Sequence, residues 1–365
     1  MSKNYYIIPI FVPHEGCPHD CVFCNQDKIT GVKKDSLRIV DNLSRENIIP
    51  DCSTTEEEEV TAESVRKTVY EYLETINNKE ATVEVSFFGG TFTGIKEEKQ
   101  RELLEVAKEF KEKGLIDKIR LSTRPDYIND HILSYLKEYK TDIIELGVQS
   151  LNEEVLLKAG RGHGVKEVAE ASRLIKEYGF VLGHQIMPGL PGDSFETDID
   201  TVKKSISMKP DICRIYPALT IRGTFMEVMY NRGEYTPYTL EEAVEISKKM
   251  YRMYSENKVN VIRIGLQPTE TINEAKDVIA GPFHPAFREL VESSLMTELI
   301  LEAMKEQKAV IHINPKEISK LYANKKMYFN LLKNNGKIIK VEQDDKVERG
   351  RIILYLENRK MDIIY

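Results

Sequence analysis

The sequence predicts an α/β fold with a parallel sheet, followed by a small C-terminal α+β domain. Short β-branched runs alternate with longer amphipathic segments over most of the chain, a rhythm typical of βαβ units. A second observation concerns the ends of these runs, where Gly, Pro, Arg, Gln and Cys gather repeatedly. Because parallel strands end at one edge of a sheet or barrel, we expect a functional site at that edge.

The expected strands of the sheet cover residues 5–12, 81–88, 118–123, 143–148, 180–187, 212–216 and 259–264. The expected helices cover residues 62–76, 96–113, 127–140, 165–178, 195–208 and 240–256. Residues 33–62 are polar, include an acidic run from Glu56 to Glu59 and show no apolar period, which indicates a loop or insert. Six or seven βα units are too many for a small open sheet and slightly few for an eightfold barrel.

The tail is expected to form a separate small domain, so the chain divides into a core over residues 1–270 and a basic domain over residues 271–365. Its expected helices cover 289–306 and 318–333, and its expected strands cover 309–313, 337–342 and 351–356. From Leu301 to Tyr365 there are 14 Lys and Arg against 9 Asp and Glu, although the whole chain carries a net charge of −7. This balance fits a polyanionic partner such as nucleic acid, and equally a solvated surface, a lid or a strut.

Composition indicates the cellular compartment in which the protein works. No run of 18 apolar residues occurs, which excludes a membrane span, and the N-terminal apolar run is broken by Pro9 and Pro13, unlike a secretory signal. Five cysteines, three of them clustered, suit a reducing compartment better than a disulfide framework. We therefore expect a cytoplasmic protein; its oligomeric state is not indicated.

The clustered cysteines are Cys17, Cys21 and Cys24, spaced C-x-x-x-C-x-x-C directly after the first expected strand. Three thiolates on one loop can hold three irons of a 4Fe–4S cluster, leaving the fourth iron open to a substrate. A zinc site completed by His14 or His19 is the alternative metal site. A second alternative is a C-x-x-C redox pair, which holds no metal.

The spacing, with the aromatic Phe23 before the third cysteine, resembles the cluster loop of the radical S-adenosylmethionine (SAM) superfamily. The resemblance implies a partial (βα)6 TIM-type barrel, a 4Fe–4S cluster on Cys17, Cys21 and Cys24, and SAM on the open iron. It also implies that one electron, from a donor such as ferredoxin or flavodoxin, cleaves SAM to methionine and a 5′-deoxyadenosyl radical. The cofactors carry this chemistry, while the protein orients and shields them.

Candidate SAM contacts follow the strands in order. Gly89 and Gly90 allow close backbone approach, and the resemblance assigns them, with Thr91, to the SAM amino group. Arg124 can pair bidentately with a carboxylate, and Ser122 shares its strand face. A salt bridge or a plain turn is the competing structural interpretation.

Later strand ends supply the other candidates. Gln149 and Ser150 are the candidates that bind the ribose. Arg161 of the Arg-Gly-His element that follows them is a further cofactor candidate, and this element could equally be a capping loop. His184 and the rigid turn with Pro188 and Gly189 are the candidates near the adenine. Arg214 and Tyr216 share one strand face and are the candidate catalytic residues, since a buried Arg calls for an anionic ligand or acidic neighbour.

Within the superfamily, the core resembles the Elongator catalytic family, which acts on wobble uridines of tRNA. The likeness rests on residues 147–150, 158–163, 184–192, 214–217 and 263–264. The cysteine spacing departs from that family, and nothing after residue 270 resembles its acetyltransferase domain. RNA modification, with tRNA favoured, is therefore the expected function. The alternatives are a coproporphyrinogen oxidase-like protein, an enzyme acting on a small molecule or protein, and a non-catalytic metal-stabilised RNA-binding protein.

Overall fold

The structure is a computed structural model that describes residues 4–12, 19, 21–24, 60–266 and 277–365. The expected insert up to residue 59, Cys17 and His14 lie outside the described residues. The chain divides into two compact units. One comprises Met1–Gln185, Met208–Ile212 and Gly223–Val228, and the other comprises Ile186–Ser207, Cys213–Arg222 and Met229–Tyr365.

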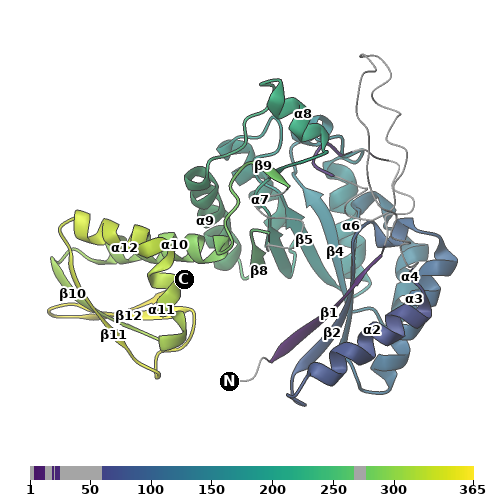
Figure 1. The fold of residues 1–365 in the computed structure, drawn as a ribbon, viewed down its shortest axis with the longest axis horizontal. Coiled ribbons are helices and arrows are strands. Elements are labelled where there is room, and N and C mark those ends of the chain that lie inside the picture. Colours follow the sequence, from purple (N-terminus) through teal and green to yellow (C-terminus); the bar gives the residue numbers. More distant parts are fainter. Residues whose placement is uncertain (1–3, 13–18, 20, 25–59, 267–276) are drawn as a thin grey trace. The chain divides into compact units, whose positions relative to one another are not determined.

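Seven strands form a curled parallel half-barrel in the order β1-β2-β3-β4-β5-β6-β8 (Figure 1), which confirms the predicted fold class. Their bounds are β1 Tyr5–Phe11, β2 Thr82–Phe88, β3 Lys118–Thr123, β4 Ile143–Gln149, β5 Val181–Ile186, β6 Ile212–Ile215 and β8 Asn260–Ile264. In the parallel register Ile8 faces Val85 and Val85 faces Ile119, and all three side chains are fully buried. Strands buried on both faces explain the nearly continuous apolar runs.

The helices between the strands are α2 Ala62–Thr75, α3 Glu97–Glu112, α4 Asp130–Glu138, α6 Val165–Glu177, α7 Phe195–Ser207 and α9 Leu240–Glu256. Their ends are encoded locally: Thr61 accepts a hydrogen bond from the Ser64 amide, and Asn129 accepts one from the Ile132 amide. Several short elements were not predicted: η1 Phe92–Gly94, η2 Pro125–Tyr127, α5 Glu153–Lys158, β7 Thr220–Ile221, α8 Phe225–Asn231 and β9 Val278–Ala280.

The C-terminal residues form a mixed sheet in the order β11-β10-β12-β13, as the predicted α+β domain requires. Its strands are β10 Lys308–Ile313, β11 Ile338–Gln343, β12 Arg351–Tyr355 and β13 Lys360–Ile364, the last of which was not predicted. Helices α10 Phe287–Ala303, α11 Ile318–Leu321 and α12 Ala323–Asn334 accompany it, with η3 Pro315–Glu317. Ile311, Leu354 and Phe329 belong to one buried core between this sheet and its helices. The domain boundary expected at residue 270 lies outside the described residues and stays a prediction.

Among the described residues, no helix is both long and apolar enough to cross a membrane.

Candidate functional site

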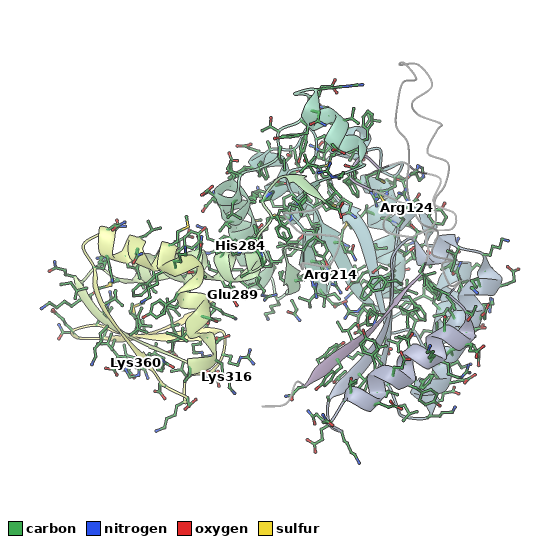
Figure 2. All side chains as sticks on the ribbon, viewed as in Figure 1. Arg124, Arg214, His284, Glu289, Lys316 and Lys360 are labelled. Atoms are coloured by element: carbon green, nitrogen blue, oxygen red, sulfur yellow. The ribbon has the colours of Figure 1, made fainter. Side chains whose placement is uncertain are left out.

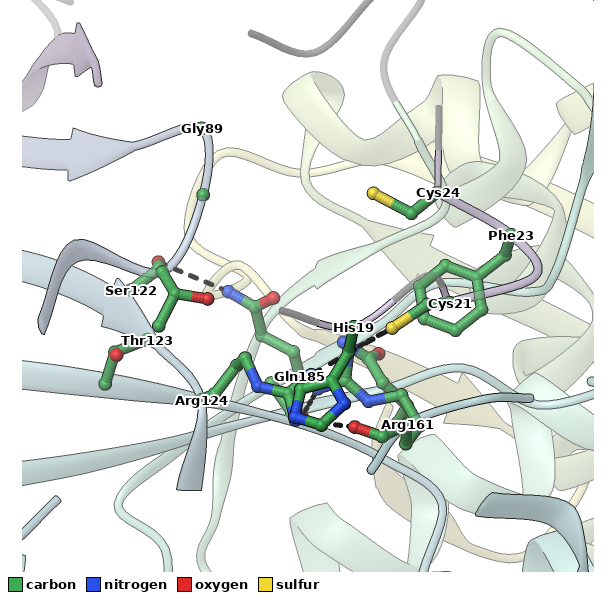
Figure 3. Close-up of a pocket in the computed structure, with 14 residues that line it drawn as sticks. His19, Cys21, Phe23, Cys24, Gly89, Ser122, Thr123, Arg124, Arg161 and Gln185 are labelled. Carbon is green, nitrogen blue, oxygen red and sulfur yellow. Dashed lines mark hydrogen bonds between the residues drawn. The ribbon is translucent and has the colours of Figure 1, made fainter. Parts of the chain in front are cut away.

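A cavity with about 560 Å³ of empty space opens in the first unit, at the carboxyl ends of strands β2 to β5 (Figure 3). Its lining residues come from the cysteine loop and from four strand ends: His19, Cys21, Phe23, Cys24, Gly89, Gly90, Thr91, Ser122, Thr123, Arg124, Gly147, Gln149, Arg161 and Gln185. The cavity therefore lies at the edge where the sequence predicted a site, and side chains of the predicted kinds line it.

Two of the three motif cysteines line this cavity together. The Cys24 amide donates to the Cys21 carbonyl across 2.9 Å, which closes a tight turn, and the Val22 amide donates to the Ala159 carbonyl across 3.1 Å. These bonds hold the end of the loop against the segment that carries Arg161. Cys21 is buried, and Cys24 is half-buried. Cys17 lies outside the described residues, so its role as a cluster ligand stays a prediction.

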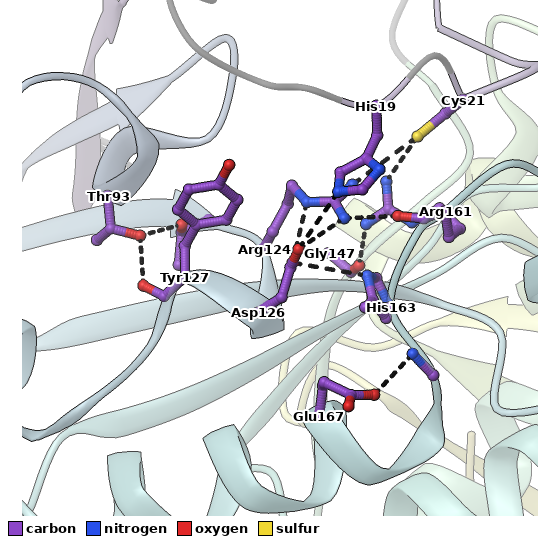
Figure 4. Close-up of polar contacts among 12 residues, drawn as sticks. His19, Cys21, Thr93, Arg124, Asp126, Tyr127, Gly147, Arg161, His163 and Glu167 are labelled. Atoms are coloured by element: carbon purple, nitrogen blue, oxygen red, sulfur yellow. Dashed lines mark hydrogen bonds and ion pairs between the residues drawn. The ribbon is translucent and has the colours of Figure 1, made fainter.

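Two guanidinium groups lie against the Cys21 sulfur (Figure 4). Arg161 Nη1 is 3.3 Å from Cys21 Sγ, and Arg124 Nη1 is 4.0 Å away. Arg161 is anchored because its Nη2 donates to the Gly147 carbonyl across 2.6 Å, and its guanidinium carbon lies 5.7 Å from the centre of the Phe23 ring. Buried positive charge beside sulfur compensates the negative charge that a metal-bound thiolate brings.

Arg124 is a cavity residue whose bidentate partner is a protein side chain. Its Nε and Nη2 donate to Asp126 Oδ1 and Oδ2 across 3.0 and 2.9 Å, and Nη2 also donates to the Arg161 carbonyl. The expected clamp on a SAM carboxylate is thus held by Asp126 here, and contact between Arg124 and SAM stays a prediction. His163 lies beside the same carboxylate, and its pKa falls to about 3 because of burial and the charges of Arg161 and Arg124.

Gly89 fits the close approach that the sequence indicated. Its φ is +112°, and a Cβ built there would lie 2.6 Å from the Val12 carbonyl oxygen. Any side chain at this position would therefore push β1 away from β2, where the Val12 amide donates to the Phe88 carbonyl across 2.7 Å. Gly90 and Thr91 follow directly and line the cavity.

Gln149 ends strand β4 in the left-handed region, with φ +67°. This conformation costs a residue with a Cβ about 1–2 kcal/mol. Within the described residues its buried Oε1 accepts no hydrogen bond, although the side chain lines the cavity. A strained residue presenting an unsatisfied acceptor to a cavity is what a ligand hydroxyl or amine would complete.

Below the cavity lies a network of buried charges. Arg120 Nη2 donates to Glu84 Oε2 across 2.8 Å and Arg120 also pairs with Glu145, and all three side chains are at most 5% exposed. Glu145 in turn accepts from Gln185 Nε2 across 2.9 Å. The Gln185 amide nitrogen also lies 3.4 Å from Ser122 Oγ. These bonds fix the orientation of two side chains that line the cavity floor.

Two predicted contacts do not reach the cavity. His184 points to the other face of β5, where its Nε2 lies 3.0 Å from Ser172 Oγ in α6, and complete burial lowers its pKa to about 3. Its neighbour Gln185 takes the interior face instead, as strand alternation requires. Ser150 is buried, and its Oγ accepts from the Asn152 amide across 3.2 Å, so it shapes the turn before α5.

The remaining predicted residues belong to the second unit. Arg214 Nη1 lies 3.2 Å from Tyr216 Oη, which confirms that the two side chains share a strand face (Figure 2 labels Arg214). Gly189, next to Pro188, has φ +82°, and its carbonyl accepts from Tyr235 Oη across 2.7 Å. Their predicted roles toward substrate and adenine stay predictions.

Sequence reasoning did not single out Gln185, Thr123 or Gly147 as site residues. Gln185 was part of a recognised strand end, but periodicity cannot tell which face of a doubly buried strand is interior. A signal existed at Gly183, where a Cβ would lie 2.7 Å from Glu145 Cγ, because a strand glycine often marks close packing of a neighbour.

One cavity of the curled half-barrel gathers two cysteines of a three-cysteine loop, a glycine-bearing strand end and a strained glutamine. This combination is of the class of site that suits an iron–sulfur cluster beside a nucleotide. The thiolates, the flanking guanidinium groups and the orphaned Gln149 oxygen suit a 4Fe–4S cluster and SAM. The family model for the Radical SAM superfamily matches residues 11–204, and the model for the Radical_SAM C-terminal domain matches residues 210–297. This chain belongs to the radical SAM superfamily.

Relatives point to one branch of that superfamily. The tRNA uridine(34) acetyltransferase of Methanocaldococcus infernus is 32% identical over 196 residues, 48% of this chain and 37% of the relative. Human Elongator complex protein 3 is 37% identical over 131 residues, 35% of this chain and 24% of the relative. The solved structure of M. infernus Elp3 with an N-terminal deletion superposes with a TM-score of 0.55 at 26% identity, covering 67% of this chain and 60% of that one. The chain thus spans between a quarter and two fifths of the curated relatives, within their radical SAM part.

Proposed function

We propose that this enzyme cleaves SAM reductively and uses the resulting radical to modify RNA, with tRNA as the favoured substrate. One observation carries the first half: Cys21 and Cys24 share a single cavity with Arg161, Gln149 and the Gly89 strand end. A structural zinc site would need four protein ligands that close the coordination sphere of the metal.

Each cavity residue has a defined part in this proposal. Cys17, Cys21 and Cys24 would hold the cluster, and the bound cluster and SAM supply an electron and a 5′-deoxyadenosyl radical for hydrogen abstraction. Arg161 and Arg124 compensate charge at the Cys21 sulfur. Gln149 Oε1 accepts a hydrogen bond from a ligand hydroxyl or amine, and Gly89 admits the ligand to the strand edge.

The substrate class is supported by relatives such as the M. infernus enzyme, whose name specifies uridine 34 of tRNA. Their acetyl transfer is not part of the proposal, because the matched region is the radical SAM part. We assign contact with the substrate to Arg214 and Tyr216. We further propose that a ferredoxin or flavodoxin in the cytoplasm supplies the electron. The excess of 14 basic over 9 acidic residues after Leu301 suits a polyanion.

The SAM half is tested by anaerobic reconstitution of the cluster, followed by dithionite and SAM. We expect four irons per chain by the cluster's stoichiometry, and 5′-deoxyadenosine above the level given by a Cys21→Ala, Cys24→Ala variant. One zinc per chain and no deoxyadenosine would favour the non-catalytic metalloprotein instead.

The RNA half is tested by mass spectrometry of nucleosides from tRNA of a deletion strain. We expect one modified nucleoside to disappear and an unmodified precursor to accumulate, with recovery on complementation. An unchanged nucleoside profile would move the substrate to a small molecule or a protein.

A further inference from the structure

The four-stranded C-terminal sheet has two unlike faces. Its inner face carries Ala309, Ile311, Ile352 and Leu354, which pack into the core with α10, α11 and α12. Because strand side chains alternate, the residues between them point to the opposite face. Within the described part of this unit, those three helices lie on the inner side only (Figure 1).

The outer face mixes charged and apolar side chains. Ile338 is 55% exposed and Tyr355 is 36% exposed, and both line one cavity at the same end of the strands. An antiparallel or mixed sheet with one face in water normally turns polar side chains outward. Two exposed apolar side chains at one cavity therefore mark the part of this face that a ligand would cover.

Lysines lie at both edges of the row that contains the tyrosine, and the His312 ring lies 4.6 Å from the Tyr355 ring, centre to centre. Val310 pairs with Lys340 on one side and with Tyr355 on the other, and Tyr355 pairs with Lys360. The row Lys340, Val310, Tyr355, Lys360 therefore crosses all four strands. Lys360 Nζ lies 5.6 Å from the centre of the Tyr355 ring.

Next to this row lies a shallow cavity with about 700 Å³ of empty space, lined by Lys308, Ala309, Val310, Ile338, Lys340, Tyr355, Leu356 and Glu357. Lys340 also pairs with Glu342 across 2.6 Å, while Glu342 and Asp344 flank His312 toward the other end of the strands. The positive charge thus concentrates at the end of the face that carries the exposed aromatic ring. We call Lys308, Val310, Ile338, Lys340, Tyr355 and Lys360 the Tyr355 face.

We infer that the Tyr355 face docks a single-stranded segment of RNA, with a base on the Tyr355 ring and phosphates on the lysines. This inference rests on the proposed RNA substrate and adds where the substrate is held. A partly exposed aromatic ring on a face that also carries lysines suits single strands, because every base has a stacking face and every linkage carries a phosphate. A protein partner would use the apolar residues but would have to bring acidic groups to Lys308 and Lys360, whereas every RNA linkage brings a phosphate.

The test measures fluorescence anisotropy of a labelled single-stranded RNA 12-mer, and of unfractionated tRNA as competitor, with the full-length chain over a salt series. The variants are Tyr355→Ala, Tyr355→Phe and the triple Lys308→Ala, Lys340→Ala, Lys360→Ala. The matched control removes three exposed lysines elsewhere: Lys113→Ala, Lys166→Ala, Lys203→Ala. An unchanged Tm for each variant shows that it is folded.

We expect Tyr355→Ala to weaken binding at least fivefold, on the order of the loss of one stacked base, and Tyr355→Phe to keep it. The triple lysine variant should lower the slope of log Kd against log salt by about 2, since each single-strand phosphate contact contributes about 0.7. Equal losses in the control triple, or unchanged affinity and slope in the face variants, would overturn the inference while leaving the proposed function standing. No RNA binding by the unaltered chain would remove the RNA substrate as well. Self-association lost on Tyr355→Ala, with RNA affinity unchanged, would assign the face to a second copy of the chain.

Discussion

Arg161 Nη1 donates a hydrogen bond to Cys21 Sγ across 3.3 Å, joining residues that are 140 positions apart in the chain. The same guanidinium is fixed by the Gly147 carbonyl at the end of β4. The sulfur of a proposed cluster ligand is thereby tied to the strand edge that carries Gln149. This one side chain couples the fold to the proposed metal site.

Replacing Arg161 should loosen the cluster without unfolding the barrel. Arg161→Met removes the charged donor to Cys21, and groups that support a metal ligand in this way typically contribute about 10–100-fold in metal affinity. We expect faster iron loss to a chelator from the reconstituted variant, with Arg161→Lys intermediate. Arg66→Met, which removes an exposed arginine paired with Glu109, serves as the control. Equal rates of iron loss in all these proteins would contradict a supporting role.

Replacing Gln149 should separate ligand binding from stability. Gln149→Gly relieves the left-handed backbone at φ +67°, offset by greater freedom of the unfolded chain, so unfolding should cost up to about 1 kcal/mol more. The lost Oε1 should weaken SAM binding measured by titration calorimetry. Lys140→Gly is the matched control, since Lys140 has φ +55° and does not line the cavity. It should share the stability change and keep SAM affinity; a parallel loss of affinity there would point to a general backbone effect.

Removing Arg120 should destabilise the first unit strongly. Arg120→Met leaves Glu84 and Glu145 buried with their guanidinium partner gone, a change that costs about 3–5 kcal/mol. Arg173→Met removes a half-exposed arginine from two carboxylates and should cost much less stability, because exposed ion pairs contribute little. Urea unfolding compares the two. Similar costs would mean that Glu84 and Glu145 find other partners.

Asp198 should make stability fall as pH rises. Burial, then the neighbouring Asp193 carboxylate, raises the pKa of Asp198 to about 9, against about 3.9 in an unfolded chain. Between these values the folded state holds a proton that the unfolded state has lost. This group's contribution is therefore full below pH 4 and declines through pH 9, by up to about 1.4 kcal/mol per pH unit.

Asp198→Asn mimics the protonated carboxyl, which accepts from Tyr238 Oη across 2.9 Å. We expect the variant to gain stability over the original at pH 8 relative to pH 5, measured by urea unfolding at both values. Asp200→Asn, on the exposed side of the same helix, controls for the loss of charge. A pH-independent difference between Asp198→Asn and the original chain would contradict the shifted pKa.

The sequence predicted the barrel well because the strands are mostly apolar runs, the helices are amphipathic, and several helices begin at a capping side chain such as Thr61 or Asn129. Short elements such as α5 and β13 escaped prediction because a few residues carry too little periodicity. The cavity was located correctly at the strand ends. Its lining was predicted only in part: His184 and Gln185 are adjacent, and their order in the chain does not say which one faces inward. The left-handed backbone of Gln149 has no counterpart in a local pattern. The Asp126 partner of Arg124 is local, two residues along the chain, but it lies in the short η2 turn that periodicity did not predict.

The Glu84–Arg120–Glu145 network also bears on how the barrel opens to solvent. Its three side chains come from β2, β3 and β4, so one guanidinium spans three neighbouring strands. Pulling any one of these strands away would leave a buried charge without its partner on the strands that remain. We therefore expect the amide hydrogens of β2, β3 and β4 to exchange with solvent as one cooperative block. This part of the sheet, beneath the cysteine loop, should stay folded while outer elements open locally.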